Sequence, residues 1–261
     1  MKIDLTGKVA IVTGGYGSIG TAMCHKFAEA GAAVAPVGRS TEKGKTFEAE
    51  LRQKGADVLF VKGDVADKQS MQDLYDTVIS KYGKIDILVN NAGFNSTAEG
   101  RVPIYDYSDD EWIQIVHGNL TGVYYCSKPV INHMKERMTG RIINIGSVVG
   151  DVPFRNQCAY AASKAGVDHL TKIMALELAP YNILVNGIRP GSITNEHNIK
   201  ILYSDKEMFE RFMSHIPLGR TGKPEEIAGT TVFLASDEVT YMTGNIITID
   251  GGWTCGFARD F

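Results

Sequence analysis

The sequence lacks the features that mark zinc-binding, disulfide-stabilised and membrane-spanning proteins. Its four cysteines are scattered without the closely spaced pairs of zinc sites, and a chain of 261 residues does not need disulfides for stability. We therefore expect reduced thiols, no metal site and a cytoplasmic protein. No apolar run reaches the roughly 18 residues of a membrane-spanning helix, and because the first expected strand begins by Val9 we expect no signal peptide.

Neither sign of charge is in large excess. Lys and Arg number 27 against 30 Asp and Glu, which gives a net charge of -3. Binding to phosphate backbones needs clustered Lys and Arg, so we expect neither nucleic acid nor an anionic membrane surface as a partner. Hydrophobic residues make up 44% of the chain, enough to bury a large core, and we expect one domain over residues 1–261.

The chain does contain a recurring unit, a short apolar run followed by a helix-length segment. Residues 21–31 and 164–179 have apolar positions three and four apart, which predicts helices. Strands and helices in alternation favour parallel pairing, so we predict a single-domain doubly wound α/β Rossmann fold, a seven-stranded parallel sheet with helices on both faces. Ligands of such sheets bind beyond the carboxyl ends of the strands. The predicted strands span residues 8–14, 32–38, 56–65, 85–93, 140–147, 183–191 and 245–252.

Two segments depart from this alternation. Residues 192–220 are a long polar stretch, and we expect a helical substrate lid there, although a packed surface excursion fits equally well. Residues 253–261 hold three aromatic side chains. We expect this tail to pack against a neighbouring subunit or to close its pocket, while packing on its own subunit is equally compatible with the sequence.

A glycine-rich turn, AIVTGGYGSIG at residues 10–20, joins the first expected strand to the first expected helix. Gly14 can adopt backbone angles closed to other residues, and Gly20 lets the helix pack closely on the sheet. The N–H groups at the start of the helix are then free to bind a pyrophosphate. Taken alone, the stretch also fits an ordinary tight turn.

The turn resembles the Thr-Gly-x-x-x-Gly-x-Gly motif of the short-chain dehydrogenase/reductase family at Thr13, Gly14 and Gly20, with Ser18 in place of the middle glycine. The resemblance covers nearly the whole chain. It implies an NAD(P)-dependent oxidoreductase that interconverts a secondary alcohol and a ketone (EC 1.1.1.-), assembled as a homotetramer. The other segments similar to family motifs are GDV at 63–65, NNAG at 90–93, RPGSIT at 189–194 and the C-terminal stretches GRTGKPEEIA and TGNIITIDGG.

The end of the second strand indicates which nicotinamide dinucleotide binds. NAD sites carry an Asp or Glu about 20 residues past the glycine turn, but residues 37–40 read VGRS. Arg39 can make bidentate bonds to a 2′-phosphate with Ser40 as a second donor, so we expect NADP(H), with NAD(H) as the alternative. A solvated Arg is the competing interpretation. The cofactor residues that we expect are Gly14, Tyr16, Ser18, Ile19, Gly20, Arg39, Ser40, Asp64, Val65, Asn91, Ala92, Gly93, Tyr160, Lys164, Pro190, Gly191, Ile193 and Thr194.

Tyr160 and Lys164 are the candidate acid and base pair. They lie four apart in an expected helix, so both project from one face about 6 Å apart along its axis. A free phenol, with a pKa of about 10, is too weak an acid at neutral pH, and a nearby ammonium lowers that pKa. The resemblance implies that Ser147 hydrogen-bonds the substrate oxygen. It also implies that Asn119 holds a water leading protons to Lys164, which binds the nicotinamide ribose.

The substrate pocket is expected from the segment after residue 93, the segment between Ser147 and Tyr160, and the lid. Polar residues are dense there, and because each buried unpaired donor is costly, a polyol or sugar-like ketone is our first interpretation. The expected substrate residues are Phe94, Arg155, Asn156, Gln157 and His197, and their neighbours in these segments include Asn95, Glu99, Arg101, Asp151 and Phe154.

Two other functions stay open. A 3-oxoacyl thioester reductase acting on acyl-carrier-protein or CoA esters is similar in the segment GRIINIGSVVG at 140–150, although Met138 and Tyr181 stand where carrier-dependent members tend to place basic residues. A non-catalytic dinucleotide-sensing or scaffold protein would keep the fold without the chemistry. The intact acid and base pair argues against that function, because a sensor needs no acid/base tyrosine.

Overall fold

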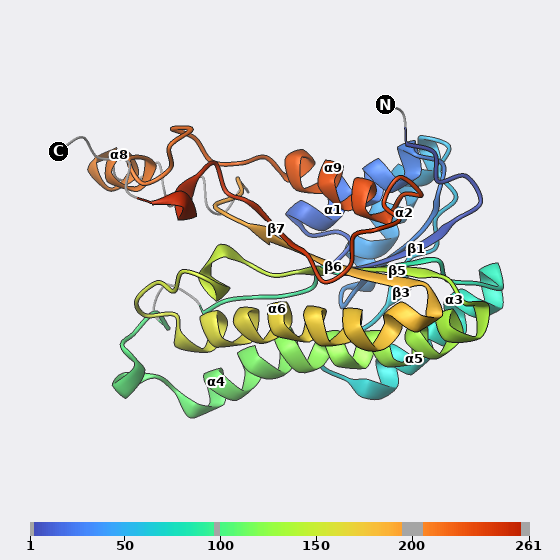
Figure 1. Ribbon diagram of the computed structural model, residues 1–261, viewed down its shortest axis with the longest axis horizontal. Coiled ribbons are helices and arrows are strands. Elements are labelled where there is room, and N and C mark those ends of the chain that lie inside the picture. Colours follow the sequence, from blue (N-terminus) through green and yellow to red (C-terminus); the bar gives the residue numbers. More distant parts are fainter. Residues whose placement is uncertain (1–2, 97–99, 195–205, 257–261) are drawn as a thin grey trace.

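Strands in the described residues form one seven-stranded parallel sheet in the order β3-β2-β1-β4-β5-β6-β7 (Figure 1). The computed structural model describes residues 3–96, 100–194 and 206–256. This architecture confirms the predicted doubly wound fold. The strands are β1 (Val9–Thr13), β2 (Ala33–Gly38), β3 (Val61–Lys62), β4 (Ile87–Asn90), β5 (Gly140–Ile145), β6 (Ile183–Pro190) and β7 (Ile246–Ile249).

The central strands are buried on both faces, which explains their continuous apolar runs. Every residue of β1 and β4 is buried, as expected for parallel strands covered by helices on each side. The edge strand β3 is much shorter than its predicted range 56–65, because only Val61 and Lys62 pair continuously with β2 and one further bridge joins Val34 to Val58. The alternation predicted the order of elements better than their ends.

Helices cover both faces of the sheet (Figure 1). One face carries α1 (Ser18–Glu29), α2 (Thr41–Gln53) and α9 (Pro224–Ala235). The other carries α3 (Lys68–Tyr82), α4 (Asp109–Val116), α5 (Gly122–Arg137) and α6 (Cys158–Leu178), with a π-helical turn, His117–Thr121, joining α4 to α5. The helix α8 (Lys206–Met213) lies in the expected lid segment. No helix in these described ranges is long and apolar enough to cross a membrane.

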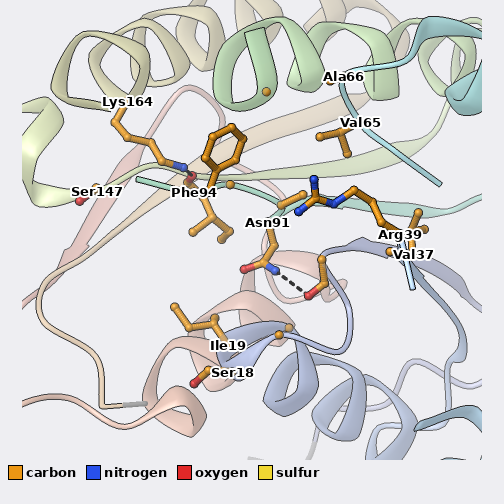
Figure 2. Close-up of a pocket in the computed structure, with 18 of the residues that line it drawn as sticks. Ser18, Ile19, Val37, Arg39, Val65, Ala66, Asn91, Phe94, Ser147 and Lys164 are labelled. Carbon is orange, nitrogen blue, oxygen red and sulfur yellow. Dashed lines mark hydrogen bonds between the residues drawn. The ribbon is translucent and has the colours of Figure 1, made fainter. Parts of the chain in front are cut away.

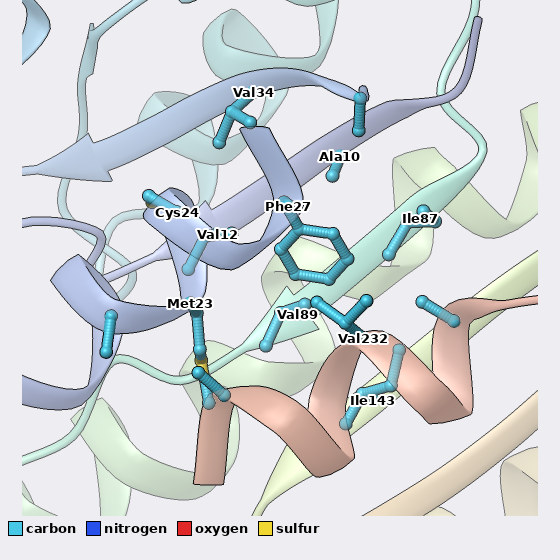
Figure 3. Packing of buried hydrophobic residues seen from close by; sticks show 14 of the residues in the cluster. Ala10, Val12, Met23, Cys24, Phe27, Val34, Ile87, Val89, Ile143 and Val232 are labelled. Atoms are coloured by element: carbon cyan, nitrogen blue, oxygen red, sulfur yellow. The ribbon is translucent and has the colours of Figure 1, made fainter. Parts of the chain in front are cut away.

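The hydrophobic core is split by the sheet into two layers. Figure 3 shows the first, in which Phe27 of α1 lies among Val89 of the sheet and Val232 of α9, all within 5% exposure. The second layer joins α3, α5 and α6 to the opposite face of the same strands. Both layers use one sheet, so the carboxyl ends of its strands are held in a fixed arrangement.

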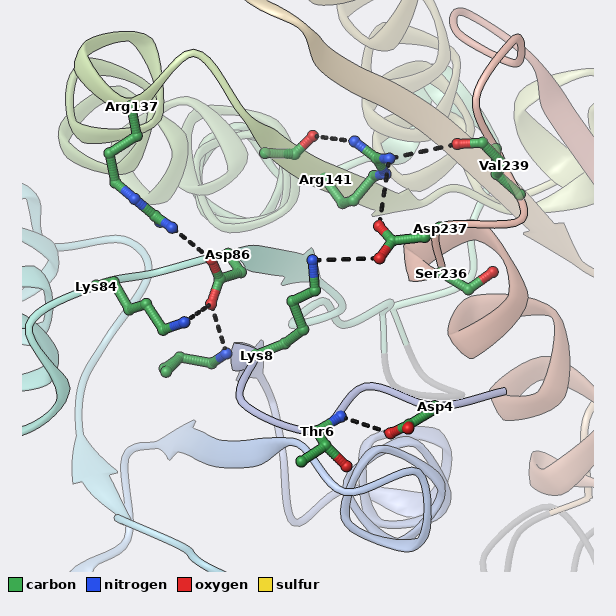
Figure 4. Close-up of polar contacts among 12 residues, drawn as sticks. Asp4, Thr6, Lys8, Lys84, Asp86, Arg137, Arg141, Ser236, Asp237 and Val239 are labelled. Carbon is green, nitrogen blue, oxygen red and sulfur yellow. Dashed lines mark hydrogen bonds and ion pairs between the residues drawn. The ribbon is translucent and has the colours of Figure 1, made fainter. Parts of the chain in front are cut away.

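Ion pairs fasten the amino ends of the strands (Figure 4). Asp86, just before β4, accepts from the Val9 N–H at 2.9 Å and from Arg137 Nη2 at 2.7 Å. Asp237 pairs with Lys8 at 3.5 Å on the same edge. The cavity lies at the opposite, carboxyl ends of the strands.

Candidate active site

A cavity of about 680 Å³ lies at the carboxyl ends of the strands (Figure 2). It is bordered by the glycine turn after β1, by the ends of β2 to β6, and by α6. The expected residues that line it are Gly14, Tyr16, Ser18, Ile19, Gly20, Arg39, Asp64, Val65, Asn91, Ala92, Gly93, Phe94, Ser147, Tyr160, Lys164, Pro190, Gly191 and Ile193. The fold thus brings together residues nearly 180 positions apart in the sequence.

The glycine turn has the geometry of a phosphate cradle. Gly14 has a φ of 64°, and a Cβ on Gly20 would overlap the Gly14 carbonyl, so neither position accepts a side chain. Gly17, the N-cap of α1, provides no side-chain cap, which leaves N–H groups of the first helical turn free toward the cavity. A dinucleotide pyrophosphate fits this arrangement.

Ser18 is tolerated in the turn because it is exposed. Its hydroxyl donates to the carbonyl of Thr194 at 3.4 Å, which ties the turn to the segment after β6. Thr194 itself does not line the cavity; its hydroxyl hydrogen-bonds that of Thr221. The glycine motif alone suggests that the Ser18 hydroxyl donates to a phosphate oxygen. In the structure this hydroxyl donates to the Thr194 carbonyl instead.

Asn91 braces the turn from the side of β4. Its Nδ2 donates to the carbonyls of Thr13 at 2.9 Å and Gly14 at 3.3 Å, and the Asn91 and Ala92 N–H groups both donate to Thr13 Oγ1 at 3.0 Å. Asn91 of the NNAG segment therefore has two roles: it lines the cavity, and it holds the glycine turn in place.

Arg39 extends from the end of β2 into the cavity (Figure 2). It is exposed and makes no hydrogen bond or ion pair with any residue that the structure describes. Ser40 does not line the cavity. Its hydroxyl oxygen caps α2 by accepting a hydrogen bond from the Lys43 N–H at 3.3 Å, and its hydroxyl proton is what Ser40 could still donate to a 2′-phosphate. Asp64 lines the cavity and uses one carboxylate oxygen to accept from the Ala66 N–H at 3.0 Å.

Asn119 is fully buried in the π-helical turn between α4 and α5. It forms two hydrogen bonds with the Phe94 backbone, at 2.9 Å from the N–H and 2.8 Å to the carbonyl, and a third to Ser163 Oγ at 3.2 Å. A Cβ on Gly93 would lie 3.2 Å from both Asn119 Oδ1 and Lys164 Nζ. The two polar groups therefore meet beside Gly93, although Asn119 does not itself line the cavity.

Tyr160 and Ser147 hydrogen-bond to each other across the cavity wall. Burial raises the pKa of the Tyr160 phenol, and the hydrogen bond from Ser147 and the positive charge of Arg101 oppose that rise. Arg101 is exposed and does not line the cavity. The raised pKa keeps the phenol protonated at neutral pH, so it carries a proton to give, but it makes Tyr160 a weaker acid than a free phenol.

The expectation that Lys164 lowers the pKa of Tyr160 needs correction. Lys164 is 4% exposed, and its Nζ donates to the Ile145 carbonyl at 2.8 Å while lying 5.7 Å from the centroid of the Tyr160 ring. Burial lowers the pKa of Lys164 to about 8, against the attraction of Asp168. The groups that lower the pKa of Tyr160 here are Ser147 and Arg101.

An ion-pair network that the sequence did not suggest lies behind the pair. Asp168, one turn after Lys164 in α6, accepts from Arg189 Nε of β6 at 2.7 Å. Arg189 also pairs with Asp151, in the loop after Ser147, at 2.9 Å. Arg189 lies more than 20 residues from Asp168 and Asp151 in the sequence, so no local spacing pattern predicts that they pair. The network becomes visible only in the folded structure.

The expected set omitted ten residues that line the cavity: Gly17, Val37, Gly38, Gly63, Ala66, Gln114, His117, Gly118, Ile145 and Gly146. Gln114, His117 and Gly118 border the cavity, and His117 Nε2 lies 2.9 Å from the Ala66 carbonyl. Gln114, His117 and Gly118 are spaced three and four apart, which places them on one helical face, whereas Asn119 does not line the cavity.

The expected substrate residues are only partly brought together. Phe94 lines the cavity and is 45% exposed. Arg155 and Asn156 are exposed and do not line it, and Gln157 accepts from Asn95 Nδ2 at 2.6 Å instead. His197 and Glu99 lie outside the described residues. The polar residues on which the polyol interpretation rested therefore do not form the cavity wall in the described part of the chain.

The start of the expected aromatic tail packs on its own chain. Trp253 stacks against Phe154 of the loop before α6, with ring centroids 4.9 Å apart, and edge-on against Phe212 of α8 at 5.1 Å. This contact joins α8 to the loop that follows Ser147. Residues 257–261 of the tail and 195–205 of the lid lie outside the described residues.

Comparisons with known proteins agree with this geometry. A family model described as Enoyl-(Acyl carrier protein) reductase matches residues 14–254, which contain every residue that lines the cavity. The chain is 39% identical over 254 residues to a 3-oxoacyl-[acyl-carrier-protein] reductase of Chlamydia pneumoniae, covering 97% of this chain and 100% of that protein.

Solved structures are similar over nearly the whole chain. A gluconate 5-dehydrogenase from Burkholderia cenocepacia in complex with NADP and tartrate superposes with a TM-score of 0.91 at 34% identity, covering 98% of each chain. An NAD⁺-bound xylitol dehydrogenase gives a TM-score of 0.89 at 33% identity, over 95% of this chain and 99% of that one.

Proposed function

The chain belongs to the short-chain dehydrogenase/reductase family of oxidoreductases, and from that premise we propose that it interconverts a ketone and a secondary alcohol with NADP(H). The observation that carries this proposal is the position of Tyr160, Ser147 and Lys164 on the wall of the same cavity as the glycine turn. A hydroxyl pair and a buried amine beside a dinucleotide cradle are the groups that carbonyl reduction needs.

In the proposed reaction, the bound nicotinamide supplies or accepts the hydride, which no side chain can do. Tyr160 donates its phenolic proton to the ketone oxygen as the alcohol forms, and takes it back in the reverse direction. Ser147 hydrogen-bonds the same oxygen and so holds the carbonyl in place. Lys164 binds the nicotinamide ribose, and with Asn119 it leads a replacement proton to Tyr160.

The preference for NADP(H) is proposed from the unpaired Arg39 in the cavity. A guanidinium without a partner is suited to a 2′-phosphate, which it can hold through two parallel hydrogen bonds. The described end of β2 carries no carboxylate that would bind two ribose hydroxyls. NAD(H) is the alternative, and the similar structures above hold NADP in one case and NAD⁺ in the other.

A 3-oxoacyl thioester is the substrate class that we propose first. The similarity to a 3-oxoacyl-[acyl-carrier-protein] reductase extends over the full length of that protein. The exposed ring of Phe94 at the mouth offers an apolar contact to an acyl chain. A polyol or sugar-like ketone is the second candidate, favoured by the likeness to the gluconate and xylitol dehydrogenases.

A substrate screen tests this proposal and separates the candidates. NADPH and NADH oxidation at 340 nm is measured with acetoacetyl-CoA, with the corresponding carrier-protein ester, and with a panel of ketoses and keto acids derived from sugars. Turnover of the thioesters with NADPH supports the first candidate, and turnover confined to the sugar panel supports the second. Tight dinucleotide binding without turnover of any ketone would instead favour the sensing or scaffold function.

A further inference from the structure

We infer that Tyr16 commits this site to NADP(H), because its ring fills the space from which an NAD-selecting carboxylate would have to project. The inference deepens the proposed function and rests on its NADP(H) preference. It concerns a residue of the glycine turn that lies against the end of the neighbouring strand β2.

The first step is the absence of a side chain at Gly38, the last residue of β2. A Cβ at this position would lie 2.7 Å from Tyr16 Oη and closer still to two carbons of the same ring, and these are its three nearest atoms. Gly38 is not among the glycines with a positive φ, so its backbone could accept any residue. Tyr16, and not the backbone conformation, is what requires glycine here.

The second step is that Tyr16 is held in place. Its Oη accepts a hydrogen bond from the Ser40 N–H at 2.7 Å, and its ring lies 6.1 Å from the ring of Phe60, which is 5% exposed. Ser40 is the N-cap of α2. Moving the phenol aside would break a contact at the start of a helix, so it cannot give way at little cost.

The third step concerns Arg39. This residue stands between Gly38 and Ser40, and Tyr16 contacts both of its neighbours. The Arg39 backbone is therefore fixed at the cavity wall while its guanidinium stays unpaired among the described residues. One side chain thus excludes a carboxylate at position 38 and positions the cation at position 39.

The fourth step is the selectivity that follows. An Asp or Glu at the end of this strand would bind both ribose hydroxyls of NAD and repel a 2′-phosphate. With Tyr16 present, such a carboxylate cannot be introduced at position 38 without displacing the ring. Selectivity is therefore set by two residues together, and a substitution at position 38 alone is blocked.

The test is a set of variants at the two positions: Gly38→Ala, Gly38→Asp, Tyr16→Ser, the double variants Tyr16→Ser/Gly38→Ala and Tyr16→Ser/Gly38→Asp, and the matched control Tyr16→Phe/Gly38→Asp. Dissociation constants for NADPH and NADH are measured by fluorescence titration, so the result does not depend on knowing the substrate. A thermal melt of each variant checks that it is folded.

Gly38→Ala should weaken NADPH binding by about tenfold in the original background and by much less beside Tyr16→Ser, because the three atoms nearest the added methyl all belong to the Tyr16 side chain. Gly38→Asp should bind neither dinucleotide well. The double variant Tyr16→Ser/Gly38→Asp should bind NADH at least about tenfold more tightly than Gly38→Asp does, whereas the control that keeps the ring should not.

Two results would overturn the inference: Gly38→Asp alone binding NADH as tightly as Tyr16→Ser/Gly38→Asp, or the Tyr16→Phe/Gly38→Asp control gaining NADH affinity as that double variant does. A starting protein that prefers NADH would refute the proposed cofactor instead. In that case the coupling between positions 16 and 38 would still be measured, so the two failures are distinguishable.

Discussion

Lys164 is placed where it costs stability. Its amine is buried, its ordinary pKa of 10.5 falls to about 8 through burial, and its hydrogen-bond acceptor is a neutral carbonyl. A buried cation that nothing fully compensates is a common sign of a functional residue. The stability of the protein without added cofactor should therefore improve when the charge is removed.

Replacing Lys164 by Met should raise the free energy of unfolding by about 1–3 kcal/mol near neutral pH, in spite of lost activity. Below about pH 8 the lysine is protonated in both states, so the whole burial cost is present. Between that pH and 10.5 only the unfolded chain keeps the proton, so the stability of the original protein rises with pH and the gain from Lys164→Met shrinks. Urea unfolding at several pH values measures this, and a variant less stable than the original at neutral pH would contradict it.

Residues whose chemistry depends on local spacing could be predicted from the sequence. Tyr160 and Lys164 lie in one helix and Gly14 and Gly20 in one turn, so short-range geometry placed them correctly at the cavity. Arg101, Arg189 and Asp168 act through contacts between distant segments, which no local pattern encodes. For the same reason the sequence assigned to Lys164 an effect on the Tyr160 pKa that here comes from Ser147 and Arg101.

At the scale of elements, the site depends on how β6, α6 and the loop after β5 are fastened together. Arg189 of β6 holds Asp168 of α6, whose side chain is 6% exposed, and Asp151 of the loop. The order of strands and helices followed from the alternation of apolar runs. Their ends did not: β3 extends only as far as its pairing with β2, and α6 begins at Cys158, ahead of the predicted start at Lys164.

Replacing Arg189 by Met should destabilise the protein by about 3 kcal/mol, because it leaves the Asp168 carboxylate buried without its main partner. The second variant Arg189→Met/Asp168→Leu should recover most of that loss, since an apolar pair can replace a buried ion pair. Urea unfolding of both variants measures the effect. Equal destabilisation by the single and double variants would show that the ion pair is not the cause.

At the scale of the whole molecule, the outer surface of the α4–α6 layer carries apolar side chains in contact with solvent. Ile113 of α4 is 61% exposed and Leu176 of α6 is 79% exposed. Large apolar side chains in contact with solvent are often part of a contact surface. On these side chains and the family resemblance we propose a homotetramer, which the similarity of single chains does not test.

Ile113→Glu combined with Leu176→Glu should convert the assembly into smaller particles, because two charges would be buried at the interface. Light scattering coupled to size-exclusion chromatography measures the mass of both proteins. As a control, Tyr241→Glu changes a fully exposed residue outside this layer and should leave the mass unchanged. A monomeric original protein would contradict the proposal.

The most direct test of the central claim compares kcat/KM for NADPH-dependent reduction of the best ketone from the screen in the original protein and in Tyr160→Phe. Tyr75→Phe, at a tyrosine that does not line the cavity, is the matched control. Loss of the phenolic proton donor should lower kcat/KM by about 10²–10⁴-fold while the NADPH dissociation constant changes little. A Tyr160→Phe variant that reduces the ketone as fast as the Tyr75→Phe control would show that this cavity does not use Tyr160 as its acid.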